Sequence, residues 1–174
     1  MAAPNARPRR IHHEVMHFKN IGLTSDSPCK FGYEKSTLDI LEEKDESLKS
    51  SDTCIMTGLI YPKSDIYKTG ALRVEFELHP TYPMKAPKVY IRTKIYHPNV
   101  CENGEICTSL LSPTSTVYQA VIPLYAILEE VSKVIDEPSS DLFQHTEAAA
   151  AWLYNREEYI KTATELYQKN FIPR

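Results

Sequence analysis

Hydrophobic and polar residues alternate most strictly in "ALRVEFELHP" at residues 71–80. Leu72, Val74, Phe76 and Leu78 would share one face of this stretch, with charged side chains on the other. Strict alternation predicts a β-strand that packs on one side and meets water on the other. Strand-like stretches also occupy residues 37–43, 53–61 and 88–94, whereas residues 24–36 are predicted to form a loop. The short connections favour an antiparallel meander of four strands.

A spacing of three and four residues marks the helices instead. Ile11, Val15 and Phe18 follow Pro8 at this spacing, and a longer apolar series follows Pro123. Proline suits the first turn of a helix, because its missing N–H would be unpaired there anyway. We therefore predict helices over residues 8–20, from Pro123 to Pro138, over 147–155, and over 156–170 after a cap at Asn155. The element order predicts an α+β fold, with an N-terminal helix and three C-terminal helices flanking the four-stranded sheet.

Composition limits the number of domains, the classes of partner and the cellular compartment. A chain of 174 residues, 42% hydrophobic and 25% charged, indicates a single globular domain over residues 1–174. The net charge of −3 argues against a nucleic-acid partner. No apolar run approaches the ~20 residues of a membrane helix, and no apolar signal region stands at the N-terminus. We therefore expect a cytoplasmic or nuclear protein with no membrane partner, whose four cysteines are thiols.

The first ten residues, "MAAPNARPRR", depart from this balance. They carry Arg7, Arg9 and Arg10 and no acidic residue. Such a short basic tail is either solvated or a docking face for an acidic partner.

Residues 95–121 show no clear period and contain "YHPNVCENGEIC" at 96–107. Long irregular segments in compact domains are usually functional or disordered, and the apolar residues here favour an ordered one. His97, Cys101 and Cys107 are potential metal ligands, but a structural zinc site takes four ligands, usually with a closely spaced cysteine pair. No fourth ligand is evident, so we expect no metal site.

Catalysis by a cysteine is the remaining chemistry of this segment. A cysteine–histidine dyad needs a base that a third group orients, whereas His97 precedes Pro98, which favours a structural turn. A lone thiol is the alternative, because a thiolate is intrinsically nucleophilic and accepts an acyl group from a thioester. The tetrahedral oxyanion of such an exchange needs a donor, which an asparagine N–H supplies. Asn99 stands eight residues before Cys107.

These motifs together resemble the ubiquitin-conjugating enzyme family. "YHPN" precedes the cysteine of "GEIC", and "PKSDIYKTG" at 62–70 is similar to the family's proline-to-glycine loop, with Thr69 replacing its first glycine. "HPTYPMKAPKV" at 79–89, "DEP" at 136–138 and "NREEY" at 155–159 follow in the family's order. The resemblance spans about residues 8–170 and implies a single catalytic domain of this family there, after the short basic tail. The resemblance implies that Cys107 takes the C-terminal acyl group of ubiquitin or a ubiquitin-like modifier from an activating enzyme as a thioester. A ligase of the RING or HECT type would then direct its transfer to a substrate lysine. No bound cofactor is implied, since the activating enzyme uses the ATP.

The resemblance also assigns roles to single residues. Asn99 would stabilise the oxyanion or hold the loop that does so, and His97 and Pro98 would shape the turn. Asp141 stands next to the place of an acid that orients the incoming lysine, although a surface or capping role fits it equally well. Contacts with the activating enzyme or the ligase would fall to Arg7, Arg9, Arg10, Pro62 and Met84, the last replacing a phenylalanine common in the family.

Several alternatives stay open. "GLIYPKSDIYKTG" and "GEICTSLL" resemble the neddylation branch of the family, whereas "RTKIYHPN" is equally typical of ubiquitin carriers. The tryptophan that the family usually has after the nucleophile is replaced by Tyr118, about three residues later, so the ligase-binding loop has an uncertain shape. A catalytically inactive binding relative, or a redox pair of Cys101 and Cys107, are further hypotheses. We expect a monomer.

Overall fold

The computed structural model of the protein describes residues 6–21, 29–44 and 46–174. Its sheet is an antiparallel meander of β1 (Phe31–Ser36), β2 (Cys54–Ile60), β3 (Gly70–Leu78) and β4 (Lys88–Ile91), paired in chain order. A short strand, β5 (Ile172–Pro173), pairs with the start of β3. The alternation in β3 is confirmed, because its four apolar side chains are fully buried. The four-stranded meander is also confirmed.

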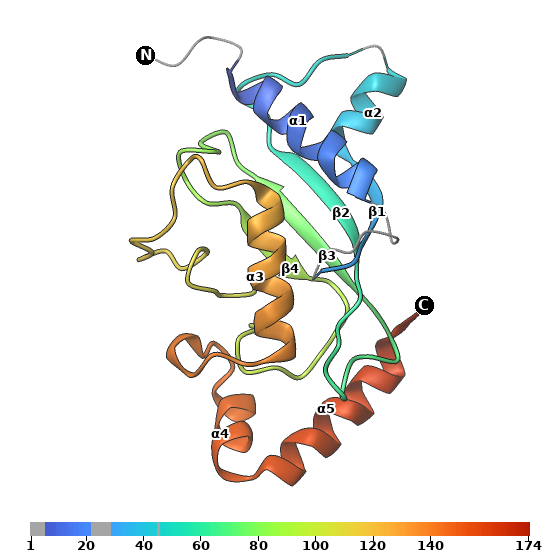
Figure 1. The fold of residues 1–174 in the computed structure, drawn as a ribbon, viewed down its shortest axis with the longest axis vertical. Helices are drawn as coiled ribbons and strands as arrows, with labels where there is room; N and C mark the ends of the chain where they lie inside the picture. Colours follow the sequence, from blue (N-terminus) through green and yellow to red (C-terminus); the bar gives the residue numbers. More distant parts are fainter. Residues whose placement is uncertain (1–5, 22–28, 45) are drawn as a thin grey trace.

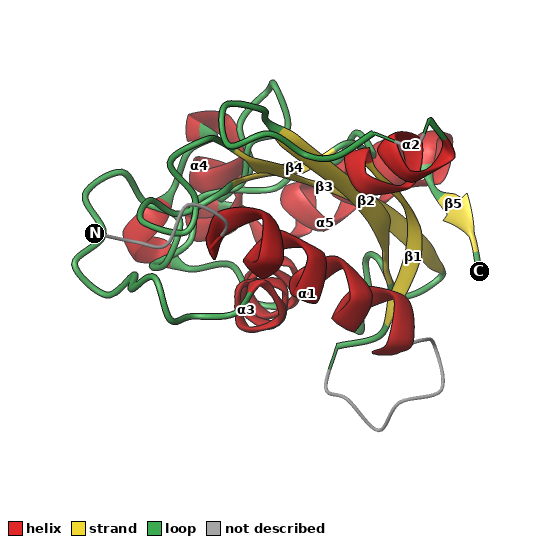
Figure 2. Cartoon of the chain, turned by 90° about the horizontal axis from the view of Figure 1, so that it is seen from above, coloured by secondary structure: helices red, strands yellow, loops and turns green. Residues whose placement is uncertain are grey.

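Two helices cover one face of this sheet. The helices α1 (Ala6–Ile21) and α3 (Leu124–Asp136) lie side by side against it (Figures 1 and 2). Ile11, Val15 and Phe18 of α1 are buried, as is the apolar face of α3. Both helices were expected from their spacing of three and four, and together with the sheet they enclose the main core.

The two C-terminal helices form an elbow at one end of the molecule (Figure 1). A short 3₁₀ helix, η1 (Ser140–Leu142), precedes α4 (Thr146–Tyr154) and α5 (Arg156–Asn170). The predicted cap of α5 is confirmed, since the Asn155 side chain accepts a hydrogen bond from the Glu158 N–H at 3.3 Å. A small second core joins this elbow to the irregular segment through Tyr96, Ala148, Tyr159 and Ala163.

The connection before β2 differs from the sequence-based expectation. Residues 37–43, predicted as a strand, form the helix α2 (Thr37–Glu43), and the first strand lies earlier, at 31–36, where a loop was predicted. The Asp39 carboxylate accepts hydrogen bonds from the backbone N–H and the hydroxyl of Ser36, at 2.6 and 3.1 Å. This arrangement stabilises a helix start and overrides the strand-like alternation of Leu38 and Ile40. Residues 24–28 of the predicted loop lie outside the described residues.

The N-terminal helix begins at Ala6, two residues before its expected start, so the three arginines are helical. In the part of the chain that the structure describes, no helix is both long and apolar enough to span a membrane.

Candidate active site

The stretch between Asn99 and Cys107 folds into a small hairpin on the edge of the sheet. Val100 pairs with Ile106 as an isolated antiparallel bridge, and the Ile91 N–H donates to the Gly104 carbonyl at 2.8 Å. Gly104 turns the chain with a φ of 88°, and an added Cβ would lie 2.6 Å from the Ile91 carbonyl oxygen. Only glycine combines this left-handed backbone with so close an approach, which fixes the hairpin against β4.

The hairpin carries both cysteines of the quoted motif. The Cys101 N–H donates to the Glu105 carbonyl at 2.9 Å, and the Cys107 N–H donates to the Asn99 carbonyl at 3.0 Å. Both thiols are half-buried, and no disulfide joins them. Because residues two apart along a strand face the same side, Cys101 and Cys107 lie diagonally across one face of the hairpin.

Neither of these thiols is activated by a lowered pKa. Partial burial raises the pKa of Cys107, and Cys101, Glu105 and Glu130 raise it further. The pKa of Cys101 is raised by burial and by Glu105. The thiol form therefore predominates at neutral pH, so the reactivity of either cysteine depends on how a partner is placed against it.

Asn99 joins the nucleophile candidate to a distant segment. Its side chain is fully buried, and its Nδ2 donates to the carbonyls of Ser139 and Leu142 at 2.8 and 2.9 Å. Its Oδ1 accepts the Ser139 N–H at 3.0 Å. Both Nδ2 hydrogens of Asn99 thus donate to the loop at residues 139–142. The backbone carbonyl of Asn99 accepts the Cys107 N–H. In this geometry Asn99 holds the loop beside the thiol, while the alternative role as oxyanion donor stays a prediction.

His97 and Pro98 complete the turn. His97 is fully buried, and its Nδ1 accepts the Asn99 N–H at 3.1 Å. Burial lowers its pKa to about 3, although the backbone carbonyls of Ile135 and Val134 act in the opposite direction. The ring is therefore neutral at physiological pH, and the acceptor nitrogen is already used. The Pro98 carbonyl accepts the N–H groups of residues 144 and 145, which adds to the attachment of the same loop.

Asp141 lies in the middle of η1, between the two residues that Asn99 binds. The residue is exposed, and its Oδ1 accepts a hydrogen bond from the Ser140 hydroxyl at 3.4 Å. The position of this acid is thus set by the same asparagine that holds the Cys107 backbone.

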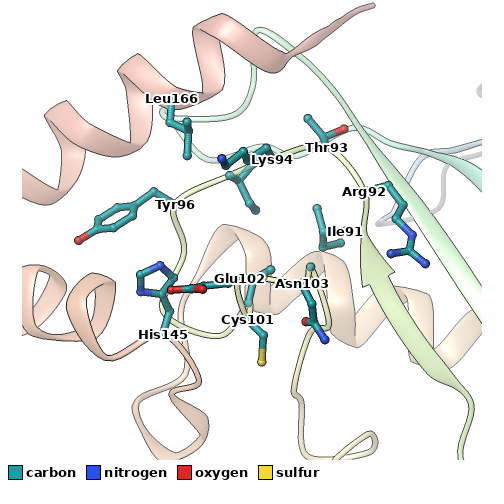
Figure 3. Close-up of a pocket in the computed structure, with 13 residues that line it drawn as sticks. Ile91, Arg92, Thr93, Lys94, Tyr96, Cys101, Glu102, Asn103, His145 and Leu166 are labelled. Atoms are coloured by element: carbon teal, nitrogen blue, oxygen red, sulfur yellow. The ribbon is translucent and has the colours of Figure 1, made fainter.

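A pocket of about 580 Å³ opens beside the turn of the hairpin (Figure 3). Cys101, Glu102 and Asn103 line it from the hairpin, and His145 lines it from the segment before α4. The Cys101 thiol donates weakly to Gln144 Oε1 at 3.8 Å. Cys107 does not line this pocket, so the two thiols meet different surroundings. Among the described residues, no group of three or more His, Cys, Asp and Glu side chains is arranged to hold a metal ion.

Comparison with known proteins decides the family. Residues 33–167 match the family described as ubiquitin-conjugating enzyme. The chain belongs to this family. It is similar to the "Ubiquitin-conjugating enzyme E2-18 kDa" of Drosophila melanogaster, with 36% identity over 140 residues that cover 78% of this chain and 84% of that protein. It is also similar to the "Ubiquitin-conjugating enzyme E2 N" of Macaca fascicularis, with 32% identity over 136 residues, 76% of this chain and 86% of that protein.

The residues expected to contact an activating enzyme or a ligase differ in how accessible they are. Arg9 and Met84 are exposed, Met84 at 78%. Arg7 donates hydrogen bonds to five backbone carbonyls of the chain. Arg10 donates to the Glu14 carboxylate and to two backbone carbonyls. Pro62 is buried, and its carbonyl accepts Arg174 Nη2 at 2.7 Å. Docking by these residues stays a prediction, and the structure leaves Arg9 and Met84 the most accessible of them.

One residue close to Cys107 in the fold could not be identified from the sequence. Glu130 of α3 binds the three residues that follow Cys107. A glutamate on an amphipathic helix normally indicates a solvated face, so its spacing alone could not identify this contact.

Proposed function

We propose that Cys107 carries ubiquitin as a thioester and passes it to a substrate lysine. In the first step the Cys107 sulfur attacks the carbonyl of the thioester on the activating enzyme. A new sulfur–carbon bond forms there, and the thiol of the activating enzyme leaves. In the second step a lysine amine attacks the same carbonyl, so an amide forms and the Cys107 thiol is released. ATP is used by the activating enzyme, and a ligase brings the substrate.

One observation carries the proposal. Cys107, whose thiol is half-buried, donates its backbone N–H to the carbonyl of the fully buried Asn99. The side chain of Asn99 in turn binds the loop at Ser139. Such a site can hold an acyl group in one position while leaving the sulfur accessible, which is what transfer between thiols and then to an amine requires. The relatives named as ubiquitin-conjugating enzymes support ubiquitin as the modifier. The likeness of two loops to the neddylation branch makes its modifier the second candidate.

The test is a charging assay with ATP, using the ubiquitin and the neddylation activating enzymes, each with its own modifier. We expect a mass increase with ubiquitin that thiol reductant removes. Cys107→Ser should give an adduct that resists reductant and yields to base, because an oxyester replaces the thioester. Cys101→Ser is the matched control on the same hairpin and should charge normally. A reducible adduct on a protein without Cys107 would contradict the proposal, and charging only by the neddylation enzyme would replace ubiquitin with that modifier.

The same assay extends to Asp141, which we propose orients the incoming lysine. Asp141→Ala should charge at the wild-type rate and discharge more slowly to free lysine. Equal slowing of charging and discharge would instead indicate a structural role in η1.

A further inference from the structure

One carboxylate ties the residues after the nucleophile to helix α3. Glu130 Oε2 accepts the Thr108 hydroxyl at 2.8 Å and the Leu110 N–H at 3.3 Å, and Oε1 accepts the Ser109 hydroxyl. Thr108 is fully buried, so its hydroxyl needs this partner. Hydrogen bonds to an ionised acceptor are stronger than those between neutral groups. Glu130 therefore binds three consecutive residues that begin directly after Cys107.

The backbone of the nucleophile is consequently held on both sides. On one side, the Cys107 N–H donates to the Asn99 carbonyl at 3.0 Å. On the other side, Glu130 fixes Thr108, whose carbonyl accepts the Leu111 and Ser112 N–H groups of the turn that follows. The first anchor belongs to the turn of the motif, whereas the second comes from a helix more than twenty residues away in the chain.

The same carboxylate belongs to the electrostatic surroundings of the thiol. The groups that act on Cys107 are Cys101 and Glu105 on the hairpin and Glu130 on α3. All three favour the protonated thiol over the thiolate. Glu130 thus binds the chain directly after Cys107, and its negative charge acts in the direction that favours the thiol.

We propose that Glu130 is a positioning residue for acyl transfer on Cys107: its charged carboxylate fixes residues 108–110, the chain directly after the nucleophile. The proposal rests on the transfer function proposed above. It predicts that removing the charge changes two rates in opposite directions. The thiol reacts faster with a small alkylating agent, because more thiolate is present. Transfer becomes slower, because the sulfur is less well placed against the thioester carbonyl.

The test uses Glu130→Gln in the full chain carrying Cys101→Ser, so that Cys107 is the half-buried thiol that remains. Glutamine keeps the size of the side chain but replaces one acceptor oxygen with a donor, so the three donors cannot all be satisfied. Alkylation by iodoacetamide is followed by mass spectrometry across pH, and charging is followed by single-turnover kinetics. We expect the alkylation profile to move to lower pH and the charging rate to fall about tenfold.

Two matched variants separate position from charge. Glu129→Gln removes a neighbouring glutamate of α3 that does not bind residues 108–110, and both rates should stay at the parent level. Glu130→Asp keeps the charge on a shorter side chain. It should slow charging while leaving the alkylation profile near that of the parent. If Glu130→Gln does not fold, the charging rate of Glu130→Asp tests whether Glu130 positions the chain.

The outcomes are distinct from those of the proposed function. Charging at the parent rate in both Glu130 variants, or an alkylation profile in Glu130→Gln that does not move to lower pH, overturns the proposal. Alkylation needs no activating enzyme. If the parent protein charges with neither modifier, the proposed function fails, and the alkylation profile still judges the role of Glu130 beside the thiol.

Discussion

The two halves of the segment between β4 and α3 differ in how they are held. In residues 97–108, three polar side chains are fully buried: those of His97, Asn99 and Thr108. His97 accepts the nearby Asn99 N–H, whereas the partners of Asn99 and Thr108 lie in the loop around η1 and on α3, far along the chain. In residues 112–121, no side chain is buried, and Val117 and Val121 are more than half exposed.

The difference shows which half of the segment has a fixed geometry. A buried polar group costs about 1–3 kcal/mol when its partner is removed, so residues 97–108 have few alternative arrangements. Residues 112–121 are exposed or half-buried, as is typical of surface loops that contact partners. The first half therefore suits the making of a covalent bond, and the second half suits contact with a partner. The predictions below test this contrast from its strongest side to its weakest.

The largest effect is expected for Asn99→Ala. The substitution removes both Nδ2 donors and the Oδ1 acceptor, and it leaves the backbone groups of Ser139 and Leu142 without their partner. We expect the free energy of unfolding to fall by about 3 kcal/mol, because several bonds of a buried amide are lost together. Urea denaturation measures this change.

Asn103→Ala is the matched control, an exposed asparagine on the same hairpin that accepts one hydrogen bond, from the Glu105 N–H. It should lower stability by less than 1 kcal/mol, consistent with a single solvated bond. Similar losses for the two asparagines would show that the buried network adds nothing to the fold.

The second prediction concerns pH and His97. Its pKa is about 3 in the folded chain against an ordinary value of 6.5, so the unfolded state binds a proton that the folded state does not. The stabilising contribution is complete above pH 6.5 and is lost progressively as the pH falls from 6.5 toward 3. Between pH 7 and pH 5, this one group should cost about 2 kcal/mol of stability.

Urea denaturation at the two pH values tests this. His97→Gln should lose less stability than the wild type over the same interval, whatever its stability at pH 7. His13→Gln, which removes an exposed histidine of α1, should follow the wild type. A wild-type slope in His97→Gln would mean that the ring binds protons equally in the folded and unfolded states, and that burial does not lower its pKa.

The contrast also explains what the sequence could and could not predict. The period of α3 and the alternation of β3 are local patterns of apolar residues, and both were interpreted correctly. The helix α2 was predicted as a strand, whereas Ser36 and Asp39 are spaced as in a capping box, which indicates a helix start. The motif of residues 97–107 identified the candidate nucleophile. The partners of Asn99 lie about forty residues away and Glu130 on a later helix, and no local pattern encodes such contacts.

The smallest effect is expected in the exposed half, for Tyr118→Phe. The Tyr118 hydroxyl donates to the Pro83 carbonyl at 2.8 Å, while the ring packs against the core. Phenylalanine keeps the ring and loses this bond, so we expect a loss of about 1 kcal/mol in urea denaturation. The alkylation rate of Cys107 should not change, because the hydroxyl contacts none of the residues 97–108. A loss as large as that of Asn99→Ala, or altered alkylation, would show that the two halves of the segment are coupled rather than independently held.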